Sequence, residues 1–198
     1  LSYASFHASK TIITGEGGMI LTNSKKICLK LKTLRNHGQK SNKPYYYNMT
    51  GGNFRLSNIL ASIGYSQLLR IKKIIKKKIE MNSIYEKRLS KNKNFSLMQD
   101  PNNFLPVRWG FPILFKKQKD RNNIMKILNT KSILCRPGFY SLNKLKHLNI
   151  YKNESSLKKD FKNAEIATKN VLVLPMNNKL KNSELNFICS KIKDYFKD

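Results

Sequence analysis

The residues best suited to chemistry lie close to the start of the chain, where Lys10 stands in the stretch SFHASKTIITGEGG. A lysine acts as a nucleophile only if it loses its proton near neutral pH, which requires desolvation or a cationic neighbour. Its neighbours in sequence include four apolar residues, Phe6, Ala8, Ile12 and Ile13. The glycines of the GEGG turn also let a ligand or another backbone segment approach closely. These surroundings suit a reactive lysine.

Hydroxyl groups flank the same lysine. Ser5 and Ser9 precede it, and Thr11 and Thr14 follow it. Hydroxyls and backbone N–H groups are the donors that a phosphate ester requires. A lysine that condenses with an aldehyde whose phosphate is held nearby is the arrangement of pyridoxal phosphate. A lysine beside a glycine turn is also common as a plain surface residue, so the spacing alone leaves both interpretations open.

Strands and helices alternate along the chain. The patterns predict strands at 3–7, 18–22, 107–115, 132–136 and 171–174. They predict helices at 24–36, 56–89, 118–129, 158–169 and 182–196. A polar loop rich in glycine and tyrosine covers residues 37–52, and loops of this length are often functional. The alternation indicates a layered α/β or α+β arrangement.

The composition limits the class of protein. A chain of 198 residues with 40% hydrophobic residues can form one ordinary domain or two small ones. No apolar run approaches the roughly 20 residues needed to span a bilayer, and the first residues do not resemble a signal peptide. The chain does not begin with Met and opens in a predicted strand. We therefore expect it to be a piece of a longer protein whose N-terminal part is missing.

The charge is strongly positive, with 39 Lys and Arg against 11 Asp and Glu and a net charge of +28. Such a positive charge is typical of proteins that bind nucleic acid or anionic membranes. The basic residues are, however, spread along the whole chain, and heavy use of lysine and asparagine also follows from an AT-rich coding sequence. The run KKIIKKK at 72–78 fits a solvated helix face, because Leu68, Ile71, Ile75 and Ile79 keep helical spacing. We therefore attribute the positive charge mainly to drift of the amino-acid composition, together with a modest preference of the protein for small anionic ligands.

The three cysteines are Cys28, Cys135 and Cys189, and they form no CxxC pair. This argues against a zinc site and against a disulfide scaffold. We expect each cysteine to be a small apolar filler in a protein of the reducing cytoplasm, with no bound metal.

The stretch SFHASKTIITGEGGMILTN resembles the Schiff-base lysine segment of the DegT/DnrJ/EryC1/StrS family, the pyridoxal-phosphate-dependent sugar aminotransferases. The resemblance continues in the family's order through LRNHG at 34–38, GGNFRLSNILASIGYSQL at 51–68, RPGFY at 136–140 and AE…LVLPM at 164–176. It implies the α/β fold of type I aminotransferases. Residues 1–70 would complete the large cofactor-binding domain, and residues 71–198 would form the small C-terminal α+β domain.

The resemblance also implies roles for individual residues around pyridoxal phosphate. Lys10 would form the Schiff base, Ser5 would bind the cofactor phosphate, and His7 would stand near the cofactor and the sugar. Asn53 would reach the phosphate of the neighbouring subunit's cofactor, which implies a homodimer with shared sites, and Arg55 would lie beside it near anionic substrate groups. For His7, a hydrogen-bonded histidine without a chemical role is an equally good interpretation.

Two further residues would line the side where a nucleotide sugar enters, namely Arg136 and Tyr140. A plain structural turn set by Pro137 and Gly138 explains RPGFY equally well. The stretch SFHASKTIITGEGG, which is close to the pattern SFHxSK…TTGEGG, is most similar to members that aminate C4 of a nucleotide-linked 4-keto-6-deoxy sugar for polysaccharide biosynthesis. The amino donor would be an amino acid, most often glutamate in this family.

The family's pattern also places several groups before the lysine: a phosphate-binding turn, an aromatic ring on the pyridine and an Asp that pairs with the pyridine nitrogen. Only nine residues precede Lys10. We therefore expect the full-length parent to be the enzyme and the 198 residues alone to be inactive.

Two rival functions remain. A dehydratase of the same fold carries histidine in place of the Schiff-base lysine, so Lys10 favours the aminotransferase. A basic nucleic-acid-binding module would explain the charge, but the sequence has neither zinc ligands nor the aromatic-rich strand of a ribonucleoprotein motif.

Overall fold

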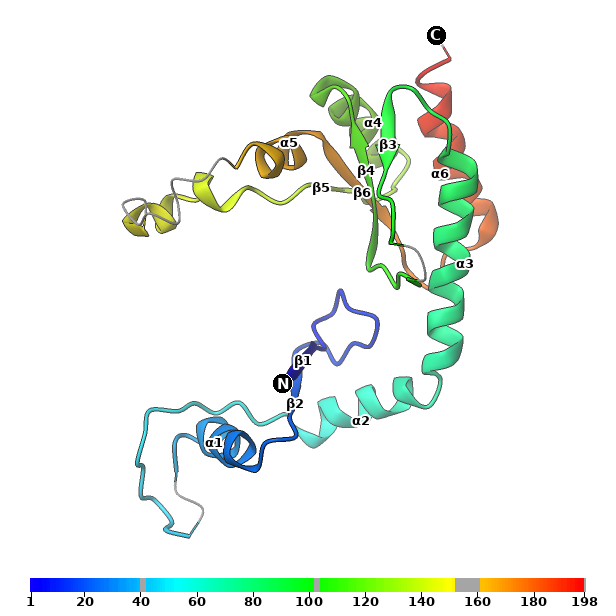
Figure 1. Cartoon of the computed structure of the whole chain (residues 1–198). Coiled ribbons are helices and arrows are strands. Elements are labelled where there is room, and N and C mark those ends of the chain that lie inside the picture. Colours follow the sequence, from blue (N-terminus) through cyan, green and yellow to red (C-terminus); the bar gives the residue numbers. More distant parts are fainter. Residues whose placement is uncertain (40–41, 102–103, 152–160, 198) are drawn as a thin grey trace. The chain divides into compact units, whose positions relative to one another are not determined.

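The structure is a computed structural model that describes residues 1–39, 42–101, 104–151 and 161–197 (Figure 1). Its contacts divide the chain into two compact units, Leu1–Lys73 and Ile74–Asp198. The division lies three residues after the boundary expected from the sequence. That residues 1–70 complete a large cofactor-binding domain stays a prediction.

The first unit contains a hairpin and two helices. Strands β1 (Ser2–Ser5) and β2 (Gly18–Leu21) pair antiparallel, with Ser5 opposite Gly18. Helices α1 (Lys25–Arg35) and α2 (Asn58–Leu68) follow. Each begins at a serine cap, because the Oγ of Ser24 accepts from the Ile27 N–H and the Oγ of Ser57 accepts from the Leu60 N–H, both at 3.3 Å.

These elements bury little within their own unit. Every residue of β1 and β2 is exposed, and no residue of α1 or α2 is buried. Large apolar side chains therefore remain at the surface, among them Tyr3 at 87% and Ile59 at 76% exposure.

The second unit is a four-stranded antiparallel sheet with helices. Its strands, in the order β3-β4-β6-β5, are β3 (Phe95–Leu97), β4 (Gly110–Phe115), β6 (Val171–Pro175) and β5 (Arg136–Pro137). Its helices are α3 (Ile71–Leu89, which begins in the first unit), α4 (Gln118–Thr130), α5 (Lys162–Asn170) and α6 (Asn182–Asp194). Two 3₁₀ turns, η1 (Leu142–Lys144) and η2 (Lys146–Tyr151), lie between β5 and α5.

The core of the second unit lies between this sheet and its helices. The alternating burial of β6, in which Leu172 and Leu174 are buried, shows the pattern of a strand with one face on the core. The buried side chains come from α3, β3, β4, α4, β6 and α6, and the largest are Tyr85, Phe111, Phe115, Met81, Leu89, Ile113, Ile124, Leu128, Leu172, Leu174, Leu185 and Ile188. Cys135 and Cys189 belong to this core as the sequence predicted, whereas Cys28 is only half-buried.

A buried polar network ties α3 to neighbouring segments. The Arg108 guanidinium donates from Nη2 to both carboxylate oxygens of Asp100, at 2.7 and 2.6 Å, and from Nη1 to the Asn82 side chain. Lys78 donates from Nζ to the Met176 carbonyl, and the Tyr85 hydroxyl donates to the Pro175 carbonyl at 3.0 Å. Desolvation by burial lowers the pKa of Lys78 and raises that of Tyr85.

Several secondary-structure predictions needed correction. The helix predicted over 56–89 is two helices, because α2 ends in a tight turn where the Arg70 N–H donates to Gln67 three residues back. Lys78 is buried rather than solvated, because it lies on the face of α3 that carries Met81 and Tyr85. The strand β3 was not predicted. The expected strand at 132–136 is reduced to Arg136–Pro137, and residues 158–160 of the predicted helix 158–169 lie outside the described residues. None of the described helices is long and apolar enough to cross a membrane.

Candidate functional site

Lys10 lies in a closed turn between β1 and β2. The Phe6 N–H donates to the Gly17 carbonyl and the Thr14 N–H donates to the Phe6 carbonyl, both at 2.8 Å. Inside this closure the Lys10 N–H donates to the His7 carbonyl at 2.9 Å. The backbone around the lysine is therefore fixed by its own hydrogen bonds.

The turn is anchored to α2 by the side chain of Gln67. Its Oε1 accepts from the Ile13 N–H at 3.1 Å, and its Nε2 donates to the Ile13 carbonyl at 2.5 Å. Glycine is required on both sides of this contact. Gly17 has φ +136°, and a Cβ on Gly64 would approach the Thr14 methyl group to 2.9 Å. Gly17 and the GYSQ segment of α2 therefore hold the lysine turn in its position.

The side chains near Lys10 form a small polar group. The Ser5 Oγ accepts from the His7 N–H at 3.4 Å, and His7 Nδ1 lies 3.1 Å from the Ser9 Oγ. His7 Nε2 lies 3.9 Å from a carboxylate oxygen of Glu16, a contact that is weak because the two side chains are 53% and 81% exposed. The structure thus brings together three of the residues predicted from the sequence, Ser5, His7 and Lys10.

The environment of Lys10 differs from the expected one. Phe6, Ile12 and Ile13 are half-buried, but Lys10 and Ala8 are exposed. The expectation that neighbouring apolar side chains desolvate this lysine is therefore not met within residues 1–73.

Asn53 and Arg55 lie along the C-terminal end of α1. The Gly52 N–H donates to the Leu34 carbonyl and the Phe54 N–H donates to the Arg35 carbonyl, both at 3.0 Å. Asn53 pairs with Asn36 in an isolated bridge, and Arg55 donates from Nη1 to the Asn36 side chain at 2.7 Å. Both predicted side chains are exposed. Asn36, which orients Arg55, was not predicted from the sequence.

Arg136 and Tyr140 belong to the second unit. Arg136 is an exposed residue of β5, opposite Val173 of β6. After it, the Gly138 N–H donates to the Val171 carbonyl at 3.0 Å, and a Cβ on Gly138 would overlap the Ala167 carbonyl oxygen. The RPGFY segment is therefore held against β6 and α5.

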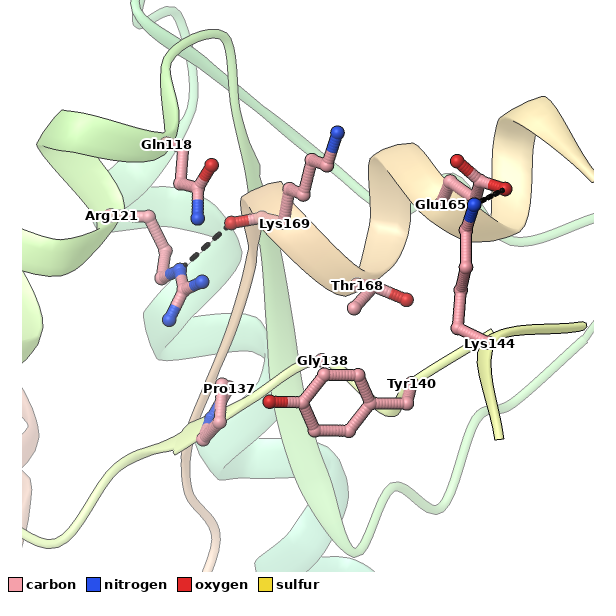
Figure 2. A pocket seen from close by; sticks show the side chains of 9 residues that line it. All are labelled: Gln118, Arg121, Pro137, Gly138, Tyr140, Lys144, Glu165, Thr168 and Lys169. Carbon is pink, nitrogen blue, oxygen red and sulfur yellow. Dashed lines mark hydrogen bonds and ion pairs between the residues drawn. The ribbon is translucent and has the colours of Figure 1, made fainter. Parts of the chain in front are cut away.

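Tyr140 lines a pocket whose other walls the sequence did not predict (Figure 2). The pocket lies between α4, α5 and the segment after β5, and its lining residues are Gln118, Arg121, Pro137, Gly138, Tyr140, Lys144, Glu165, Thr168 and Lys169. No local sequence signal marks this combination, because it gathers residues from four separate segments.

The fold is shared with solved sugar aminotransferases and with a sugar dehydratase. The structure aligns with *Helicobacter pylori* PseC, an aminotransferase of pseudaminic acid biosynthesis, at a TM-score of 0.85 and 24% identity over 98% of this chain and 52% of that one. It aligns with the *E. coli* GDP-4-keto-6-deoxy-D-mannose-3-dehydratase with bound hydrated PLP at a TM-score of 0.77 and 22% identity over 96% and 53% of the two chains. At these identities the likeness shows the fold alone.

The sequence comparison places the chain in one family. Residues 1–193 match the DegT/DnrJ/EryC1/StrS aminotransferase family, and the chain belongs to it. The GDP-perosamine synthase of *Vibrio cholerae* is 31% identical over 198 residues, which is 99% of this chain and 53% of that protein. The chain spans about half the length of the curated relatives it matches.

Proposed function

We propose that the chain carries the cofactor lysine of a pyridoxal-phosphate-dependent aminotransferase that acts on a nucleotide-linked 4-keto-6-deoxy sugar. The amino group would come from an amino acid such as glutamate and would go to C4 of the sugar. The observation that carries the proposal is the position of Lys10 in a closed, glycine-dependent turn of a chain that matches the aminotransferase family over residues 1–193.

The groups around Lys10 fit an aldehyde that carries a phosphate. Among the described residues, the Lys10 side chain has no hydrogen-bond or ion-pair partner, so its Nζ is free to bind a carbonyl carbon and to carry a proton. The Ser5 Oγ accepts from the His7 N–H and keeps its own proton to donate to a phosphate oxygen. When bound, pyridoxal phosphate supplies an electron sink for cleavage of the C–H bond beside the nitrogen.

The remaining chemistry belongs to the residues of this chain. We infer that Lys10 Nζ moves the proton between the cofactor carbon and the substrate carbon, as a general acid and base. The contact with Ser9 orients the His7 ring within the turn, and Gln67 holds the turn in place. The exposed Lys10 still requires desolvation, which surfaces other than residues 1–73 must supply.

The principal alternative is a sugar dehydratase of the same fold. The fold does not decide between the two, because the structure aligns with both an aminotransferase and a dehydratase. The aminotransferase is favoured because position 10 is lysine, whereas the resemblance implies histidine there in the dehydratases.

Borohydride labelling tests the role of Lys10. Reduction of the full-length parent in the presence of pyridoxal phosphate should fix the label on the peptide that contains Lys10. The exposed Lys26 of α1 provides a control, because Lys26→Ala removes the same charge outside the turn. The Lys10→Ala variant should lose the specific label and the amination, and Lys26→Ala should keep both. Specific labelling elsewhere, or undiminished amination in Lys10→Ala, would refute the assignment.

We also infer a homodimer whose sites are shared between subunits. Asn53 and Arg55 are exposed on a segment pinned to α1, and the Asn36 contact keeps the Arg55 guanidinium in a fixed position. Exposed side chains held in this way are available to a partner subunit. Mixing the whole protein as Lys10→Ala with the whole protein as Asn53→Ala should restore part of the activity, because mixed dimers regain one intact site. No recovery after demonstrated subunit exchange would contradict the shared site.

We infer that the positive charge of the chain helps to attract small anionic molecules. A field from +28 charges speeds the encounter with a nucleotide sugar, whereas random nucleic acid binds by counterion release. Binding to random nucleic acid should therefore vanish near physiological salt, while amination persists. Nanomolar binding to a defined RNA or DNA at physiological salt would favour the nucleic-acid module instead. We further infer a cytoplasmic location, which agrees with three cysteines that form no disulfide.

A further inference from the structure

The pocket beside Tyr140 holds a buried cation whose donors are only partly used. The pocket has a volume of about 370 Å³, within the range of pockets that bind small ligands. Arg121, in the first turn of α4, is only 8% exposed. Its Nε donates to the Lys169 carbonyl at 2.9 Å, and no other partner of its guanidinium exists among the described residues. A guanidinium carries five N–H donors, so the four on the two Nη atoms of Arg121 are available to a ligand in the pocket.

The guanidinium faces groups that suit an anionic ligand. Figure 2 shows the Nη atoms of Arg121 on the side of Pro137 and the Tyr140 ring, and the Gln118 amide on the other side of the guanidinium, by the Lys169 carbonyl. Gln118 is the first residue of α4, and the cap residue Lys117 gives this helix no side-chain cap. The first N–H groups of α4 therefore add positive potential to this end of the pocket.

The charges that line the pocket leave an excess of two positive charges. Arg121, Lys144 and Lys169 are cationic, and Glu165 is the one carboxylate. Hydrogen bonds from Asn143 and then from Lys144 lower the pKa of Glu165, so this carboxylate stays ionised. It is 3.1 Å from Lys144 Nζ, and the pair compensates itself. Among the described lining residues, Arg121 and Lys169 form no ion pair, although Lys169 also contributes to the lowered pKa of Glu165.

Other polar groups of the pocket are already occupied. The Thr168 hydroxyl donates towards the carbonyls of Phe139 and Ala164, at 2.8 and 2.9 Å, and accepts from the Ser141 N–H at 2.9 Å. The Thr168 hydroxyl therefore stabilises the wall of the pocket and is not available to a ligand. The Tyr140 ring and the Pro137 ring supply an apolar surface beside the free donors.

We propose that this pocket binds a small organic phosphate. The dianionic phosphate lies between the Arg121 guanidinium and the Tyr140 hydroxyl, and the organic part lies against the rings of Tyr140 and Pro137. A phosphate monoester carries about −1.5 to −2 charges at pH 7, which matches the excess of two positive charges on the described lining residues. The inference does not rest on the proposed aminotransferase activity, since it uses neither Lys10 nor its turn.

The probe for the test is phenyl phosphate, titrated into the 198-residue chain at physiological salt and followed calorimetrically. Saturable binding should be stronger than that of benzoate or phenol, because benzoate has one charge and phenol has none. Equal binding of benzoate, or no saturable binding of phenyl phosphate up to about 10 mM, would overturn the proposal.

Variants then locate the binding. Arg121→Gln should weaken phenyl phosphate binding about ten- to a hundredfold, the range expected for a lost charged hydrogen bond. Lys126→Gln removes one charge from an exposed position of the same helix and should change the affinity less than about twofold. Equal effects of the two variants would mean that phosphate binds only to the general positive field, and the proposal would fail.

Two milder variants keep the test decisive if Arg121→Gln does not fold. Lys169→Gln retains the backbone carbonyl that Arg121 uses, and Tyr140→Phe removes only an exposed hydroxyl. Each should weaken binding about three- to tenfold relative to Lys126→Gln. Unchanged affinity in both would refute the placement of the phosphate.

Discussion

Replacement of Arg108 by methionine should strongly destabilise the second unit. The Arg108 side chain is 8% exposed and its partner Asp100 is 17% exposed, so the ion pair is largely buried. Methionine fills much of the same volume but leaves Asp100 as an uncompensated charge and the Asn82 side chain without its donor. Breaking a buried pair in this way costs about 3–5 kcal/mol.

Urea denaturation followed by tryptophan fluorescence measures this loss. Trp109 is the one tryptophan of the sequence, and it lies next to Arg108 in the second unit. With a slope of about 1.5 kcal/mol per M, a loss of about 3 kcal/mol lowers the urea midpoint by about 2 M. Circular dichroism gives a second probe that does not depend on the surroundings of Trp109.

Two further variants separate the ion pair from other effects. Glu86→Gln is the matched control, because Glu86 is 42% exposed and lies 3.5 Å from Arg108, so the loss should stay below about 1 kcal/mol. The double variant Asp100→Asn with Arg108→Met removes both charges and should be about 2 kcal/mol more stable than the sum of the single losses predicts. The reasoning is refuted if Arg108→Met loses less than about 1 kcal/mol or if the two substitutions are additive.

Three other outcomes follow from the structure. Gly38→Ala should destabilise the segment after α1 by more than about 1 kcal/mol, because Gly38 has φ +77° and a Cβ would overlap the Met49 carbonyl; unchanged thermal unfolding would contradict this. Burial raises the pKa of Cys135 to about 12 and that of Cys189 to about 11, so both stay protonated up to about pH 10. A thiol reagent should therefore label the half-buried Cys28 first at every pH below 10, and prior labelling of either core thiol in mass spectrometry would count against the fold. The 198-residue chain on its own should bind pyridoxal phosphate weakly, because the side chains assigned to that cofactor are exposed; a stable absorbance band of bound cofactor at micromolar concentration would disprove this.

The sequence alone determined much of the local structure. The helix at 25–35 follows from its serine cap and apolar spacing, and the strand at 171–175 follows from its run of β-branched and leucine residues. The lysine turn was also predictable, because SFHASK and GEGG are contiguous and the hydrogen bonds that close the turn join residues at most eleven positions apart, such as Phe6 and Gly17. Family membership followed from the same contiguous motifs.

Only the tertiary structure decided the remaining features, because they depend on residues far apart in the chain. Lys78 is buried, and its Nζ donates to the carbonyl of Met176, the residue that follows β6. No pattern within KKIIKKK distinguishes this lysine from its solvated neighbours. The Nη donors of Arg121 are free because its described neighbours in the fold offer only one carbonyl, that of Lys169, 48 residues later, and this carbonyl accepts from Nε. The exposure of Lys10 likewise depends on which surfaces pack over the turn, and the apolar residues next to it in sequence do not supply that cover. Local propensity sets a helix, a strand or a turn, whereas desolvation and unpaired charge are properties of the packed whole.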